Sequence, residues 1–202
     1  VYGTFKTLAI VPNIPLGLSS ENLTNNSFTL DWNAPSFDGG SEITDYVVEV
    51  NGGGMARKAI AHQPSSSTYL TITGLQPATK YSVRVKAINS IGSSKVSATL
   101  AVTTKPEAPN APSGLAIKSV TSTTVTITWL APLSGGSKIT DYLVEYSSDQ
   151  GETWIPINRA PSTTPNLVIK SLKTKTNYLF RVTAKNSVGY GVVSGSLAVT
   201  TP

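Results

Sequence analysis

The chain has 202 residues, of which 39% are hydrophobic and 13% charged, and its formal net charge is +5. This composition supports ordinary hydrophobic cores and argues against intrinsic disorder, and no apolar run approaches the roughly 18 to 20 residues that cross a bilayer. The sequence has no cysteine, which excludes disulfides, thiolate metal sites and cysteine nucleophiles.

The first twelve residues resemble a segment that occurs twice further along the chain. Leu8-Ala9-Ile10 is similar to Leu100-Ala101-Val102 and Leu197-Ala198-Val199, and Tyr2-Gly3 is similar to Tyr190-Gly191. Because each later segment is the predicted last strand of a repeated unit, residues 1–12 are expected to be the last strand of a preceding module. The alternative is a frayed leader.

Residues 13–104 predict about seven short strands and no helix. Apolar and polar residues alternate with period two in Phe28–Trp32, Tyr46–Val50 and Tyr81–Ala87, which places one apolar face on each strand. Glycine clusters at 38–40 and 52–54 separate these runs and indicate turns.

The same pattern returns 97 residues later, where Trp129 repeats Trp32. A period near 100 residues is the length of an independently folding domain. We therefore predict two homologous domains, residues 13–104 and 113–202. Further pairs at this shift are Leu18/Leu115, Pro35/Pro132, Leu75/Leu172, Tyr81/Tyr178, Asn89/Asn186 and Gly92/Gly189.

The predicted linker between the domains, residues 105–112, is rich in proline. Pro106, Pro109 and Pro112 recur at three-residue spacing, which favours an extended polyproline II path and a semi-rigid spacer. The copies are then expected to lie end to end in a rod on the order of 70 Å long. Calcium bridging at the junction would need several carboxylates, and Glu107 is the only one there, so no interdomain metal is expected.

Seven short strands in about 90 residues predict two packed antiparallel sheets per domain. The fold class is therefore all-β, with two tandem seven-stranded sandwiches.

The sequence resembles the immunoglobulin-like fibronectin type III family. The residues that carry the resemblance are Trp32 with Ala34-Pro35, Trp129 with Ala131-Pro132, Ile43–Tyr46, Ile139–Tyr142, Leu75–Tyr81 and Ala87–Gly92. The resemblance implies a tyrosine corner at Tyr81 and Tyr178, whose hydroxyl bonds back to the upstream backbone. Since Thr174 replaces the proline of the first copy, the second corner is expected to have a slightly less rigid turn.

Residues Ser147–Trp154 resemble an Asp-box, in which the aspartate caps backbone amides and the tryptophan covers the turn. We interpret this hairpin as structural. The alternative is a glycan that stacks on Trp154. Such a site would exist only in the second copy, because the corresponding turn of the first copy, Asn51–Met55, has no aromatic residue.

Two carboxylate pairs, Asp45/Glu49 and Asp141/Glu145, raise the hypothesis of a glycosidase. Along one strand each pair spans about 13 Å, more than the roughly 5 Å or 6.5 to 9.5 Å of the two glycosidase mechanisms. His62 is the single histidine, so a catalytic triad could form at most once. We predict no enzyme activity, no catalytic or metal-binding residue and no cofactor.

The basic residues form at best one modest row in each copy. Arg84 and Lys86 in the first copy, with Arg181 and Lys185 in the second, are predicted on exposed strand positions. Scattered bases at this density indicate an ordinary solvated sheet face, so neither a nucleic-acid partner nor membrane insertion is expected.

The resemblance implies a non-catalytic extracellular or cell-surface protein, either secreted or adhesive. Its domains are expected to act as a semi-rigid spacer or protein-interaction surface within a longer modular protein. Absent disulfides favour a bacterial-type source, and the chain has no Arg-Gly-Asp adhesion tripeptide. Expected partners are other proteins or neighbouring modules of the same array, with self-association and a glycan ligand possible. The alternatives are an accessory carbohydrate-binding or linker region of a secreted polysaccharide hydrolase, and a repeat subunit of a surface filament or phage appendage.

Overall fold

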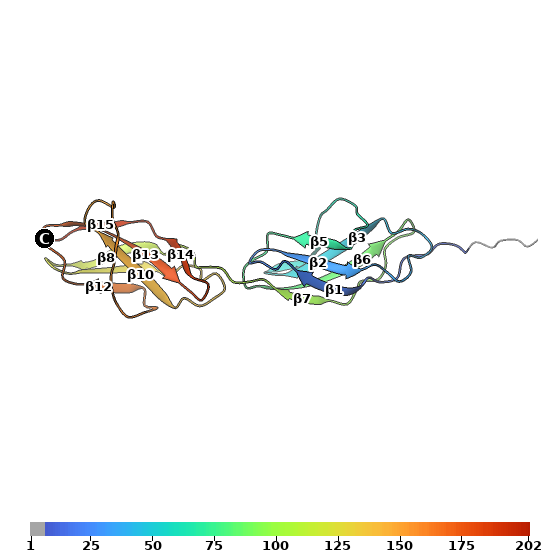
Figure 1. The fold of residues 1–202 in the computed structure, drawn as a ribbon, viewed down its shortest axis with the longest axis horizontal. Helices are drawn as coiled ribbons and strands as arrows, with labels where there is room; N and C mark the ends of the chain where they lie inside the picture. The colour runs from blue at the N-terminus through green and yellow to red at the C-terminus, as the bar shows by residue number, and fades with distance from the viewer. Residues whose placement is uncertain (1–6) are drawn as a thin grey trace, which may run out of the picture. The chain divides into compact units, whose positions relative to one another are not determined.

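The computed structural model describes residues 7–202, which are all-β in both halves of the chain (Figure 1). Two compact units divide between Lys105 and Pro106. Among the described residues no helix is long and apolar enough to cross a membrane.

The first unit is a sandwich of two antiparallel sheets. One sheet has the order β1-β2-β5 and the other β4-β3-β6-β7. Its seven strands are β1 (Leu16–Glu21), β2 (Phe28–Asn33), β3 (Asp45–Gly52), β4 (Met55–Ala59), β5 (Tyr69–Ile72), β6 (Lys80–Ile88) and β7 (Leu100–Thr103). The number of strands agrees with the prediction for this copy.

The second unit repeats this topology with its last strand in two pieces. One sheet has the order β8-β9-β12, and the other β11-β10-β13-β14 with β15 also paired to β13. The strands are β8 (Ser113–Val120), β9 (Val125–Leu130), β10 (Asp141–Ser147), β11 (Ile155–Pro156), β12 (Asn166–Ile169), β13 (Asn177–Lys185), β14 (Tyr190–Val193) and β15 (Leu197–Thr200). In the first unit the counterpart of β14 is reduced to a single bridge between Ile88 and Ser93.

The core of each sandwich contains one of the paired tryptophans. Trp32 and Trp129 are 5% and 4% exposed, which confirms their predicted burial at equivalent positions. Each indole packs edge-on against a tyrosine of the other sheet, with ring centroids 5.2 Å apart for Tyr46 and 5.1 Å for Tyr142. Burial raises the pKa of both tyrosine hydroxyls, so they stay neutral.

Both tyrosine corners form as the resemblance implied. The backbone N–H of Gln76 donates to the Tyr81 hydroxyl at 2.8 Å, and that of Lys173 donates to the Tyr178 hydroxyl at 3.0 Å. Both turns have a left-handed residue at the same position, since Ala78 and Lys175 have φ of 47° and 50°. With threonine in place of proline, the second corner keeps this torsion and its hydrogen bond, while its lower rigidity stays a prediction.

The segment before the first domain does not form the expected strand within the described residues. Ile10 donates its backbone N–H to the Gly39 carbonyl at 2.8 Å and accepts from the Asn89 amide at 2.7 Å. Glu107 makes the same two bonds, to the Gly135 carbonyl at 2.9 Å and from the Asn186 amide at 2.7 Å.

Residues 8–10 therefore occupy the place of the connector before the second domain. Residues 7–12 carry no strand in this structure, and a short apolar triplet becomes a strand only where a sheet edge is available to pair with it. The Tyr2-Gly3 similarity lies outside the described residues, and a preceding module stays a prediction.

Close packing of this segment requires glycine at its contact point. Gly39 has φ of 84°, and a Cβ there would lie 2.0 Å from the Ile10 carbonyl oxygen. Gly135 has φ of 67°, and its Cβ would lie 2.3 Å from the Glu107 carbonyl oxygen. Glycine alone permits both the left-handed backbone and the close approach.

Candidate functional site

The outward charges of each domain form cross-strand ion pairs. Glu49 on β3 contacts Arg84 at 2.6 Å and Lys86 at 3.0 Å, and Glu145 on β10 contacts Arg181 at 2.8 Å. The hydrogen bonds from Lys86 and Arg84 lower the pKa of Glu49. The predicted basic row is thus partly neutralised by carboxylates on the neighbouring strand.

The other member of each carboxylate pair has a structural role. Asp45 accepts the backbone N–H of Ser65, and Asp141 that of Ser162, both at 3.0 Å. The two acids of each pair therefore bind separate partners. Within residues 7–202, no three His, Cys, Asp or Glu side chains gather where they could hold a metal ion.

The Ser147–Trp154 hairpin is a capped turn, as its sequence predicts. Asp149 accepts hydrogen bonds from the Ser147 hydroxyl at 2.6 Å, from the Thr153 backbone N–H at 3.0 Å, and from the Thr153 hydroxyl. These bonds lower the pKa of Asp149 from 3.8 to about 2. The turn itself has positive φ at Gln150 and Gly151, 63° and 96°.

The hairpin should open in acid at a pH set by this carboxylate. Because the pKa of Asp149 is lower in the folded state, its contribution to stability is complete above about 3.8 and is lost as the pH falls towards 2. An NMR titration of the Asp149 carboxyl carbon is expected to show a midpoint near pH 2, together with loss of the Thr153 amide protection. In a Thr153→Val control the midpoint should rise, and a wild-type midpoint near 3.8 would contradict the capping role.

Trp154 holds the hairpin over the sheet. The Arg181 guanidinium lies 4.1 Å from the centre of the Trp154 ring, in the range of a cation–π contact. One face of the indole is therefore covered by a strand residue of the same domain. This contact supports the structural interpretation of Trp154, and glycan stacking stays a prediction.

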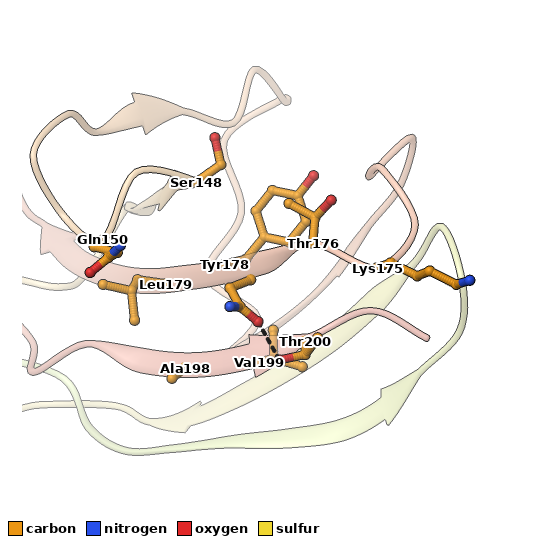
Figure 2. Close-up of a pocket in the computed structure, with 10 residues that line it drawn as sticks. Ser148, Gln150, Lys175, Thr176, Tyr178, Leu179, Ala198, Val199 and Thr200 are labelled. Atoms are coloured by element: carbon orange, nitrogen blue, oxygen red, sulfur yellow. Dashed lines mark hydrogen bonds between the residues drawn. The ribbon is translucent and has the colours of Figure 1, made fainter.

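An open groove of about 660 Å³ lies beside this hairpin. Figure 2 shows Ser148 and Gln150 at one side, Ala198 and Thr200 on β15 at the other, and Leu179 of β13 between them. Further lining residues are Lys175, Thr176, Asn177, Tyr178 and Val199. The Thr200 hydroxyl donates to the Asn177 side-chain oxygen at 2.6 Å and ties β15 to β13 at the groove floor.

The groove has a mixed polar and apolar lining. Its lining polar groups are hydroxyls, amides and the Lys175 ammonium, without a carboxylate or imidazole. In the first domain the corresponding turn is Gly52–Gly54, and a Cβ on Gly53 would lie 2.6 Å from the Tyr81 hydroxyl. That turn packs directly on the tyrosine corner, which explains why the two copies differ at this edge.

Sequence reasoning identified the hairpin but missed the groove. The lining comes from the hairpin, from the segment around the second tyrosine corner and from β15, which lie far apart in the sequence.

Sequence reasoning also missed the role of Asn89 and Asn186. The two asparagines recur at the 97-residue shift, but the hydrogen bonds by which each holds the segment before its domain were not predicted.

Comparisons with known proteins agree with the repeat. The family model "Fibronectin type III domain" matches residues 13–103 and 110–200. Mouse fast-type myosin-binding protein C is 32% identical over 195 residues, which cover 94% of this chain and 17% of that protein. Mouse neogenin is 31% identical over 199 residues, 96% of this chain and 13% of that protein. The chain therefore spans less than a fifth of the length of these relatives.

A solved structure shares the fold. The crystal structure of chicken CNTN1 FN1–FN3 domains matches with a TM-score of 0.64 at 22% sequence identity, and the match covers 95% of this chain and 67% of that one.

Proposed function

The chain belongs to the fibronectin type III family as a tandem of two domains, and from that premise we propose that it is a semi-rigid spacer. It sets the distance between neighbouring parts of a longer modular protein at the cell surface or outside the cell. It has no catalytic role, and its partners are proteins or adjacent modules.

The observation that carries this proposal is the anchoring of the chain on both sides of Pro106. On one side, the backbone N–H of Lys105 donates to Thr24 at 2.9 Å, and its carbonyl accepts from Ala78 at 3.0 Å. On the other side, Glu107 is held by the second domain through its N–H and carbonyl. The freely turning part of the predicted linker is therefore much shorter than residues 105–112, and proline fixes one of its torsions.

Insertion of Gly-Ser after Pro106 is expected to uncouple the motion of the two domains. The inserted residues add free torsions between two anchored segments, so each domain should tumble faster. Rotational correlation times from ¹⁵N relaxation, measured for β6 and β13 separately, provide the test. Pro161→Gly, in an exposed loop of the second domain, is the matched control and should change nothing. A wild-type protein whose domains already tumble independently would refute the spacer.

The charge pairing on the outward faces favours protein partners over nucleic acid. Arg84 and Lys86 share Glu49, and Arg181 pairs with Glu145, so part of the positive charge on each strand face is balanced. The polar groove of the second domain keeps open the alternative of an accessory carbohydrate-binding region. The further alternative, a repeat subunit of a filament or phage appendage, depends on self-association of the modules.

A further inference from the structure

His62 lies in the segment between β4 and β5 and faces oxygen atoms with both ring nitrogens. Nε2 is 2.8 Å from the Tyr46 carbonyl oxygen, and Nδ1 is 2.8 Å from the Gln63 carbonyl oxygen. A carbonyl oxygen can only accept a hydrogen bond, whereas a neutral imidazole has one N–H. Both contacts are hydrogen bonds only if the ring carries two protons and a positive charge.

The surroundings of His62 suit a positive ring. The Asp45 carboxylate on β3 lies 3.9 Å from Nδ1, and the two side chains are only 19% and 22% exposed. A small cavity of about 210 Å³ adjoins the ring and is also lined by Tyr46 of β3 and Tyr69 of β5, which bring the other titratable groups. Asp45 is thus the charged group that faces His62 from the strands packed against it.

The second domain has an arginine in the same place. Arg159 follows His62 by 97 residues, and its Nη2 donates to the Asp141 carboxylate at 3.0 Å and to the Tyr142 carbonyl. Its Nη1 donates to the Ala160 carbonyl at 2.9 Å, which matches the Gln63 contact of His62. These three acceptors correspond one by one to those of His62, and the guanidinium that serves them is always charged.

We propose that His62 is a pH-dependent substitute for this arginine, so that the first domain has a pH-sensitive tie where the second has a permanent one. The imidazolium fastens residues 60–68 to β3, beside the backbone bond from Ile60 to Val48. When the ring loses a proton, one nitrogen lone pair faces a carbonyl oxygen and that bond becomes a repulsion.

The direction of the pH effect follows from these contacts. The folded domain favours the protonated ring, so the stabilisation is complete in acid, where the unfolded chain also carries the proton. It falls as the pH rises above the range where a free histidine releases its proton, about pH 6.5. The first domain should therefore be less stable at a pH where the ring is neutral than at a pH where it is protonated.

The protonation state can be read directly because the chain has one histidine. A ¹H–¹⁵N spectrum of the ring nitrogens in the full chain is expected to show the imidazolium pattern at pH 7.5, where a free imidazole is mostly neutral. The pattern of a neutral tautomer under these conditions would overturn the proposal.

Exchanging the histidine and the arginine between the two domains separates the effect of the His62 contacts from other effects of pH. Urea unfolding is followed by NMR, with the Val48 amide reporting the first domain and the Val144 amide the second. In the wild type, the folded-to-unfolded ratio of the first domain should fall about tenfold from pH 5.5 to 8.5, the size of one partly exposed charge-assisted hydrogen bond. His62→Arg should abolish this fall, and Arg159→His should introduce it in the second domain.

An equal fall in wild type and His62→Arg would also overturn the proposal. If Arg159→His does not fold, the ring spectrum and the His62→Arg result still decide. His62→Gln serves as the neutral control, and it should show no pH dependence and low stability at both pH values.

Discussion

Replacing Trp129 by alanine should lower the free energy of unfolding of the second domain by about 3 to 5 kcal/mol, the usual cost of deleting a buried large aromatic side chain. The indole is 4% exposed and packs edge-on against Tyr142, so truncation removes both apolar burial and an aromatic contact. Urea unfolding followed by the NMR signals of β9 and β10 measures the loss for this domain alone.

Trp154→Ala is the control, because Trp154 belongs to the same domain but lies partly exposed on the outer face. It should cost clearly less than Trp129→Ala, since it removes chiefly the contact with Arg181. A loss below about 1 kcal/mol for Trp129→Ala, the range of ordinary surface changes, would show that Trp129 is not part of the core.

Asn89→Ala should destabilise the first domain by about 2 to 4 kcal/mol, because it removes several hydrogen bonds from a buried site at once. The Asn89 amide donates to the carbonyls of Ile10 at 2.7 Å and Asp38 at 2.8 Å, and its oxygen accepts from the N–H of Ile91 at 2.9 Å and of Gly92 at 3.1 Å. The side chain is 4% exposed, so water replaces these partners only in part. Chemical denaturation gives the energy, and amide exchange at Ile10 shows whether the preceding segment detaches.

The exposed Asn51→Ala is the matched control and should change the stability by less than about 0.5 kcal/mol. Asn89→Asp separates the two halves of the clamp, since the carboxylate keeps the acceptor for Ile91 and Gly92 but loses the donor to Ile10 and Asp38. If Asn89→Ala proves as mild as Asn51→Ala, the clamp does not hold the segment before the domain.

Features encoded by local pattern could be read from the sequence without a structure. Alternation in Tyr81–Ala87 placed the buried face of β6 correctly, because successive side chains of a strand point to opposite sides. The 97-residue shift fixed the tandem of two domains and the equivalence of Trp32 and Trp129, since a repeated sequence repeats its core. The tyrosine corner was implied by the family resemblance, and it joins residues only five apart.

Features that depend on distant segments were decided only by the tertiary structure. Leu8–Ile10 looks like a last strand in sequence, but its backbone is bound by loops that follow much later in the chain. The 97-residue shift pairs His62 with Arg159, but the two differ in size and chemistry, so only the structure showed that both face a carbonyl or carboxylate of β3 or β10. The sequence by itself determined the strands and the cores because periodic burial is a local property, whereas these ties depend on which segments the sandwich brings together.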